Sequence, residues 1–134
     1  MNGFTITREI AATPERVWAA FTDAKQYAAW IWPTDWETMC SIDAREGGVF
    51  SVASLPKGMS VEGIYTEVNP YSRLAMSWQW HGEDGKSLVT MTFEPIETGT
   101  RLILRHENFP DEASSANHEQ GWNDCLDRLP AHLA

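Results

Sequence analysis

The sequence predicts an α+β fold in which a strongly curved, seven-stranded antiparallel sheet wraps around one long C-terminal helix. Three observations lead to this prediction. Residues 36–107 alternate apolar and polar positions between short turn clusters, as an antiparallel meander does. Residues 4–10 alternate in the same way and precede two helix starts. Residues 114–129 carry the only apolar stripe at helical spacing that is large enough to cover a sheet.

One strand and two short helices open the chain. Residues 4–10 read as the strand. Thr13 followed by Pro14 predicts a helix start, because threonine is a good N-cap and proline suits the first helical position. Asp23 can cap a second short helix, which Pro33 stops. We expect these two helices to close one end of the curved sheet.

Five turn clusters divide the middle of the chain into six strand candidates. The clusters are Glu46-Gly47-Gly48, Pro56-Lys57-Gly58, Asn69-Pro70-Tyr71-Ser72, Gly82-Glu83-Asp84-Gly85 and Glu97-Thr98-Gly99. One face of these strands is apolar, with Phe50, Val52, Leu74, Met76, Trp78, Trp80, Val89, Met91, Phe93, Leu102, Leu104 and His106. The opposite face is polar, with Ser51, Ser77, Gln79, Thr90, Thr92, Arg101 and Arg105. The pattern therefore predicts a sheet with one buried and one solvated face.

The last helix is predicted to start at Ser114 or Ser115, either of which can serve as its N-cap. Its apolar stripe consists of His118, Trp122, Cys125, Leu126 and Leu129. Pro130 lacks a backbone N–H, so we expect a kink or an early stop at that point.

Length and charge limit the classes of partner. The chain has 134 residues, which predicts a single domain over residues 1–134. With 10 basic and 19 acidic residues, its net charge of -9 argues against binding nucleic acid or an anionic membrane. Neither a signal peptide nor a bilayer-spanning apolar run is present, so a cytoplasmic location is expected. Cys40 and Cys125 have no ligand spacing, which predicts two buried free thiols, with no disulfide scaffold and no zinc site.

Six short motifs follow one another in a specific order. They are Ala12-Thr13-Pro14-Glu15-Arg16-Val17-Trp18, Trp30-Ile31-Trp32-Pro33, Arg45-Glu46-Gly47-Gly48-Val49-Phe50, Glu67-Val68-Asn69-Pro70 with Arg73-Leu74, Gly99-Thr100-Arg101-Leu102, and Gly121-Trp122 with Leu126 and Leu129. In this order they resemble the helix-grip superfamily (START-like, Bet v-like, SRPBCC). Within it, the chain is similar to the C-terminal domain of activators of the heat-shock protein 90 ATPase. The resemblance implies a ligand-sized cavity between the sheet and the last helix. It implies no single reaction, because superfamily members bind lipids, hormones and polyketides, and a few are enzymes.

Seven tryptophans in so short a chain predict an aromatic cavity. Trp78 and Trp80 are two residues apart, so on a strand both indoles face the same side. We expect the partner to be a small hydrophobic or aromatic ligand and place its binding site at Trp30, Trp32, Trp78, Trp80, Met91, His106, His118 and Trp122. In this interpretation the two histidines orient the ligand. Trp18 is assigned to the core, and Trp36 has no clear place.

The same residues leave other functions open. His106 and His118 could point into the cavity from opposite walls and act as general acid and base, as in a cyclase, dehydratase or hydrolase. No third metal ligand accompanies them, because Glu107 and Glu119 lie off the apolar faces, and no cofactor is expected. A covalent mechanism at Cys40 has no supporting spacing. A chaperone-binding module and a homodimer formed through exposed edge strands are the remaining alternatives.

Overall fold

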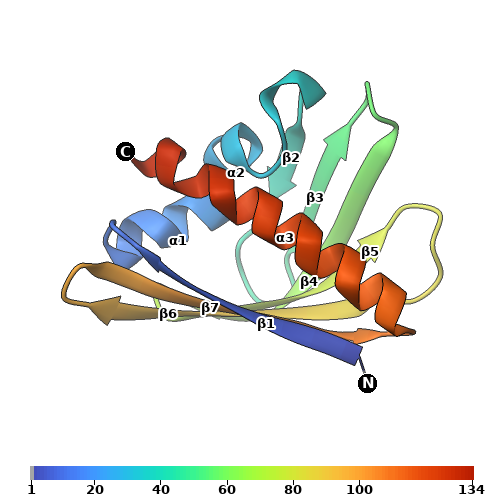
Figure 1. The fold of residues 1–134 in the computed structure, drawn as a ribbon. Coiled ribbons are helices and arrows are strands. Elements are labelled where there is room, and N and C mark those ends of the chain that lie inside the picture. The colour runs from blue at the N-terminus through green and yellow to red at the C-terminus, as the bar shows by residue number, and fades with distance from the viewer. Residues whose placement is uncertain (1) are drawn as a thin grey trace.

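In the computed structural model, which describes residues 2–134, a single sheet curves around one long helix (Figure 1). The strands are β1 (Asn2–Ile10), β2 (Met39–Ile42), β3 (Val49–Ser54), β4 (Met59–Asn69), β5 (Arg73–Trp80), β6 (Ser87–Ile96) and β7 (Gly99–Phe109). The helices are α1 (Pro14–Thr22), α2 (Ala24–Trp30), the short 3-10 helix η1 (Thr34–Trp36) and α3 (Glu112–Leu133). The predicted α+β helix-grip fold, with seven antiparallel strands and a long C-terminal helix, is confirmed.

The first and last strands of the chain pair in the sheet, whose strand order is β1-β7-β6-β5-β4-β3-β2. All six strand pairings are antiparallel, and β1 pairs with β7, so that Phe4 lies opposite His106. From β2 to β7, successive strands are neighbours, as in a meander. β1 and β2 therefore form the two edges of the sheet.

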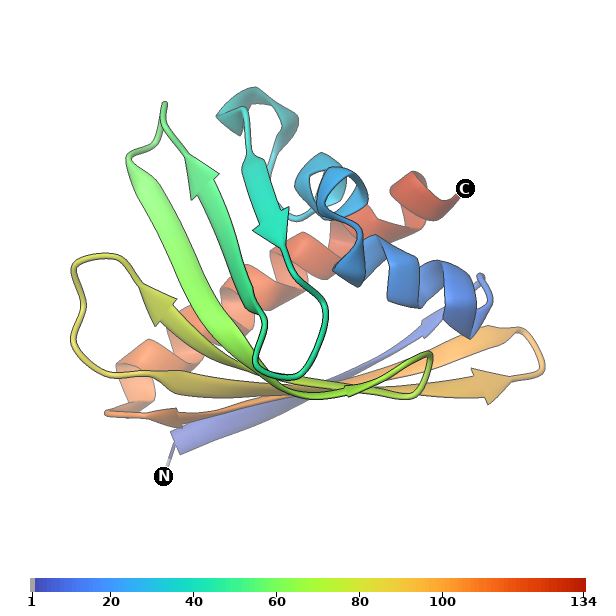
Figure 2. The same ribbon diagram turned by 180° about the vertical axis from the view of Figure 1, so that it is seen from behind.

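The sheet bends between β4 and β5, and Figure 2 shows β2, β3 and β4 standing upright against the flatter β5, β6, β7 and β1. The ladder is irregular here, with a register shift between Tyr65 and Glu67. Ile64 donates its backbone N–H to the Ser77 hydroxyl, at 3.0 Å, in place of a strand carbonyl. Gly63 permits the close approach, because a Cβ on it would overlap the Ser77 carbonyl oxygen. This bend opens the space beside α3.

Capping positions the two short helices as predicted. Thr13 accepts a hydrogen bond from the Arg16 backbone N–H at 3.3 Å, and Pro14 occupies the first turn of α1. Asp23 accepts from the Lys25 backbone N–H at 3.2 Å and starts α2. Trp36, which the sequence pattern left unassigned, belongs to η1.

The N-cap predicted for the last helix is wrong, and the helix makes no early stop at Pro130. Asp111, not Ser114 or Ser115, is the N-cap of α3, and its carboxylate accepts from the Ser114 backbone N–H at 2.8 Å. The helix also does not stop at Pro130 but continues to Leu133. Leu133 is buried, and its carbonyl oxygen accepts a hydrogen bond from Arg16, so contacts with α1 hold the last turn in place.

The core lies between the inner face of the sheet and the helices. The inward residues predicted for β3, β5, β6 and β7 are buried except Trp80, which is half-buried. Trp18 is core as expected and packs edge-on against Phe93, with ring centroids 5.3 Å apart. Cys125 is buried, whereas Cys40 is only half-buried. Within residues 2–134, no helix has both the length and the apolar character needed to cross a membrane.

Candidate ligand-binding pocket

A pocket of about 460 Å³ lies beside α3, where the sheet turns upward. Its walls come from the α2–η1 segment, from the start of β4, from the end of β5 with its following turn, and from one face of α3. The lining residues are Ile31, Trp32, Pro33, Trp36, Met59, Trp78, Trp80, Glu83, Ser114, Asn117, His118, Gly121, Trp122, Asp124, Cys125 and Arg128. Four segments far apart in sequence thus meet around one space.

Five tryptophans dominate the wall of the pocket. Trp32 and Trp80 have nearly parallel rings, 9° apart, with centroids separated by 6.1 Å. The ring centroid of Trp78 lies 5.2 Å from that of Trp122 and 6.1 Å from that of Trp80. Trp36 packs next to Trp32, with ring centroids 5.5 Å apart. Together these rings form a nearly continuous aromatic surface, which favours flat apolar molecules.

The structure separates the eight predicted site residues into two groups. Those that line the pocket are Trp32, Trp78, Trp80, His118 and Trp122. Trp30, Met91 and His106 do not line it. Trp30 points into the core and donates its indole N–H to the Ala20 carbonyl at 2.9 Å, while Met91 is 1% exposed beneath the helices. His106 is fully buried behind the wall, so the two histidines do not face each other across the cavity.

His118 holds the indole of Trp80. The Trp80 Nε1–H donates to His118 Nε2 at 2.9 Å, and His118 Nδ1 lies 2.8 Å from the Ser114 carbonyl oxygen. An indole N–H can only donate and a carbonyl can only accept. His118 is therefore neutral in this arrangement, with its proton on Nδ1, and both ring nitrogens are used.

His106 holds the indole of Trp122 in the same way. The Trp122 Nε1–H donates to His106 Nδ1 at 2.9 Å, so the ring proton lies on Nε2 and is donated to Ser87 Oγ at 2.6 Å. The Ser87 hydroxyl then donates to the Trp78 carbonyl at 3.2 Å. This buried chain fixes the tautomer of His106 and the orientation of Trp122.

The two histidines are poorly suited to act as an acid–base pair. Their ring centroids are 5.3 Å apart, but each nitrogen of both rings already has a partner. Burial, and to a lesser degree the neighbouring His118, lower the pKa of His106 from 6.5 to about 3. His106 is therefore uncharged near neutral pH and has no free nitrogen to offer a substrate.

The thiols are also in their unreactive form. Cys125 lines the pocket, and burial raises its pKa to about 12. Burial likewise raises the pKa of Cys40 to about 12. At neutral pH neither thiol is a thiolate, the form that attacks substrates. In the described part of the chain, no three His, Cys, Asp or Glu side chains are grouped to hold a metal ion.

Several lining residues are not among the eight predicted site residues. Asn117, Gly121, Asp124 and Arg128 lie along α3 beside the predicted stripe. Their spacing of four, three and four residues is itself helical, and this is the signal that could have identified them. Trp36 gave no such signal, because it lies in a single 3-10 turn.

Comparison with known proteins gives the family. The family described as Activator of Hsp90 ATPase homolog 1-like protein matches residues 11–134. The chain belongs to this family. Comparison with curated proteins gives no match.

Several solved structures superpose over nearly the full length of the chain. A Chromobacterium violaceum protein has 28% identity and a TM-score of 0.85, over 98% of this chain and 96% of that one. The AHSA1 protein of Silicibacter pomeroyi has 30% identity and a TM-score of 0.80, over 98% and 97%. An Hsp90 activator from Plasmodium falciparum has 26% identity and a TM-score of 0.82, over 98% and 95%.

Proposed function

We propose that this Activator of Hsp90 ATPase homolog 1-like protein binds a small hydrophobic, aromatic molecule in the pocket beside α3. The observation that carries the proposal is the wall of five indoles around a space of about 460 Å³. Sites for small molecules commonly have volumes of roughly 300–1,000 Å³ with mostly apolar linings and a few polar groups. The pocket has both properties.

The hydrogen bonds behind the wall support binding rather than catalysis. His118 and His106 fix Trp80 and Trp122 before any ligand arrives, and a wall ordered in advance loses less entropy on binding. An enzyme of the cyclase, dehydratase or hydrolase type needs a polar pair that converges on the substrate. The histidines that could form this pair are both occupied by indoles.

Occlusion of the pocket tests the proposal. Gly121 lines the pocket, and a Cβ built on it meets no atom within 4 Å, so Gly121→Leu should fold and fill part of the space. The matched control is Ala116→Leu, which adds the same side chain to an exposed, non-lining position of α3. Binding of neutral two-ring and three-ring aromatic compounds is followed by tryptophan fluorescence. We expect saturable binding to the natural sequence and to Ala116→Leu, and weaker binding to Gly121→Leu.

Two results would count against this function. One is the absence of any saturable change with the whole series of compounds. The other is equal binding by Gly121→Leu and Ala116→Leu, which would place the compounds elsewhere on the protein. Native mass spectrometry of protein isolated from its source cells adds an independent measurement, because a retained ligand is identified by its mass.

A chaperone-related role is the second candidate, and the similarity to the Plasmodium falciparum Hsp90 activator favours it. The likeness extends over 98% of this chain, at 26% identity. If this role holds, the purified protein should raise the ATPase rate of an Hsp90 from its own organism. An unchanged rate at saturating concentrations would exclude it.

A further inference from the structure

The pocket is lined by carboxylates that form no ion pair with any described residue and by an arginine whose guanidinium is hydrogen-bonded. Glu83 and Asp124 both line it, and no ion pair in residues 2–134 involves either carboxylate. Asp124 accepts one hydrogen bond, from Gln120 at 3.0 Å. Arg128 is the one basic residue of the lining. The lining therefore carries two carboxylates against one guanidinium.

The guanidinium of Arg128 is already engaged. Its Nε donates to the Trp30 carbonyl at 3.0 Å, and one Nη donates to the Ile31 carbonyl at 2.8 Å. The same Nη lies 3.6 Å from Cys125 Sγ. Carbonyls at a helix C-terminus carry partial negative charge, so they offset the charge of Arg128 locally. An anionic ligand approaching Arg128 would also meet Asp124, one helical turn away in the same wall.

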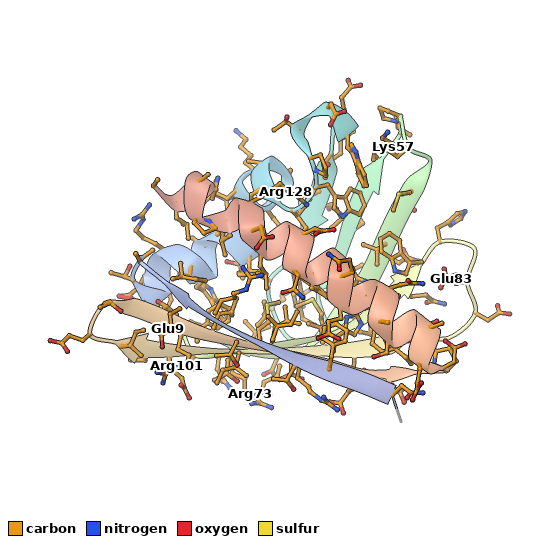
Figure 3. All side chains as sticks on the ribbon, in the orientation of Figure 1. Glu9, Lys57, Arg73, Glu83, Arg101 and Arg128 are labelled. Carbon is orange, nitrogen blue, oxygen red and sulfur yellow. The ribbon has the colours of Figure 1, made fainter. Side chains whose placement is uncertain are left out.

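The indole wall favours positive charge as well. The face of an aromatic ring is the negative part of its quadrupole and attracts cations, and tryptophan does so most strongly. One ring of this wall already has a cation over it, since Lys57 Nζ lies 5.6 Å from the centroid of Trp36. Figure 3 shows Lys57 at the turn between β3 and β4, Arg128 on α3 and Glu83 on the loop after β5. The end formed by Glu83 and Trp80 therefore combines an indole with a carboxylate that forms no ion pair within the described chain, and the only arginine or lysine of the lining, Arg128, lies elsewhere on α3.

We infer that the ligand of this pocket is an organic cation, a small aromatic molecule with a permanently or readily charged nitrogen. The inference rests on the proposed function and narrows it to one ligand class. The charged nitrogen lies toward Glu83, and the aromatic body lies against the indoles. The overall charge of -9 helps as well, because an acidic protein draws cations toward it.

Three probes of similar shape and different charge test the inference by calorimetry at pH 7.5 and low salt. They are 1-methylquinolinium, neutral quinoline and 1-naphthoate. We expect the cation to bind roughly tenfold more tightly than quinoline, and 1-naphthoate to bind most weakly. The double variant Glu83→Gln with Asp124→Asn should lose most of this preference and keep the affinity for quinoline.

The control for total charge is Glu62→Gln with Glu97→Gln, which removes two carboxylates from exposed positions outside the lining. It should keep the preference for the cation. Equal or tighter binding of quinoline or 1-naphthoate to the natural sequence would overturn the inference and leave the proposed function standing. So would an undiminished preference in the Glu83 and Asp124 variant. If none of the three probes binds, both the proposed function and the inference fail.

Discussion

The indole N–H groups of the tryptophans differ in their hydrogen-bond acceptors. Those of Trp80 and Trp122 donate to histidines, and that of Trp30 donates to a backbone carbonyl. The Nε1 of Trp78 is buried and has no partner among the described residues. A buried donor left unpaired costs about 1–3 kcal/mol, which the packing of this ring must offset. Its contacts with Phe50 and Trp122 show where that packing lies.

The bond between His118 and Trp80 can be measured by a double-mutant cycle. His118→Phe keeps a ring but removes the acceptor, and Trp80→Phe removes the donor. We expect the two changes to couple by about 1 kcal/mol in the free energy of unfolding, because either one alone already breaks the bond. Urea denaturation of the four proteins gives this number. A coupling energy of zero would show that the bond contributes nothing.

The lowered pKa of His106 links stability to pH. The unfolded chain takes up a proton near pH 6.5, whereas the folded protein resists it until the pH falls to about 3. Between these values the unfolded state binds more protons, so His106 lowers stability as the pH falls, by up to about 1.4 kcal/mol per unit. Above pH 6.5 this loss is absent.

Denaturation at pH 7, 6, 5 and 4 tests this linkage. His106→Gln offers both a donor and an acceptor but does not titrate, so its stability should fall less steeply than that of the natural sequence. His81→Gln, at an exposed position, is the control and should keep the natural slope. If the free energy of unfolding falls equally steeply with pH in all three proteins, His106 is not the source of the pH dependence.

At the scale of elements, α3 performs two tasks along its 22 residues. Its middle forms one wall of the pocket through residues such as His118 and Trp122. Its end anchors the two short helices, since Arg128 binds the carbonyls at the end of α2 and Leu133 accepts from Arg16 in α1. The helix thus connects the wall of the pocket to the two short helices.

Pro130 lies in the anchoring half of α3 and weakens it. A proline in a helix interior removes one backbone hydrogen bond and costs about 3 kcal/mol relative to alanine. Pro130 is exposed, so Pro130→Ala loses no buried contact and should raise the free energy of unfolding by about 1–3 kcal/mol. Thermal and urea denaturation both report the change. A decrease in stability would mean that the proline shapes a bend that the packing of Leu133 requires.

Local sequence signals predict the elements well and their environment less well. Thr13 and Asp23 act through bonds to residues two or three positions away, so their roles are readable from sequence. Asp111 acts at the same short range, but it directly follows Pro110, and the pair Pro110-Asp111 is equally typical of a turn. The burial of His106 behind the pocket wall could not be predicted. Alternation shows which face of the sheet a residue lies on, but not how many side chains cover it.

At the scale of the whole molecule, the bend between β4 and β5 creates the space for the pocket. Trp78 and Trp80 lie on β5, directly at the bend, while Trp32 and Trp36 reach them from the α2–η1 segment. The meeting of these four rings depends on the angle between the two halves of the sheet. No short-range pattern encodes that angle, and this is why the sequence could not show that Trp36 lines the pocket and Trp30 does not.

Gly63 tests the importance of the bend. A Cβ at this position would overlap the backbone of Ser77 and press on the ring of Phe50, so the strands would have to separate. We expect Gly63→Ala to lower the free energy of unfolding by about 2–3 kcal/mol. Gly121→Ala is the matched control, because its Cβ meets no atom within 4 Å and should stabilise α3 by about 1 kcal/mol. Equal changes in the free energy of unfolding for the two variants would show that β4 and β5 accommodate a Cβ at residue 63.

The pairing of β1 with β7 has a consequence for how the chain is made. Phe4 leaves the ribosome long before its partner His106, roughly 5–20 s earlier at typical rates of synthesis. Until then β1 lacks its partner strand, and the meander from β2 to β6 is the first part of the sheet able to form. The buried hydrogen bond that Trp122 donates to His106 must form later still. The wall of the pocket is therefore among the last parts of the nascent protein to take shape.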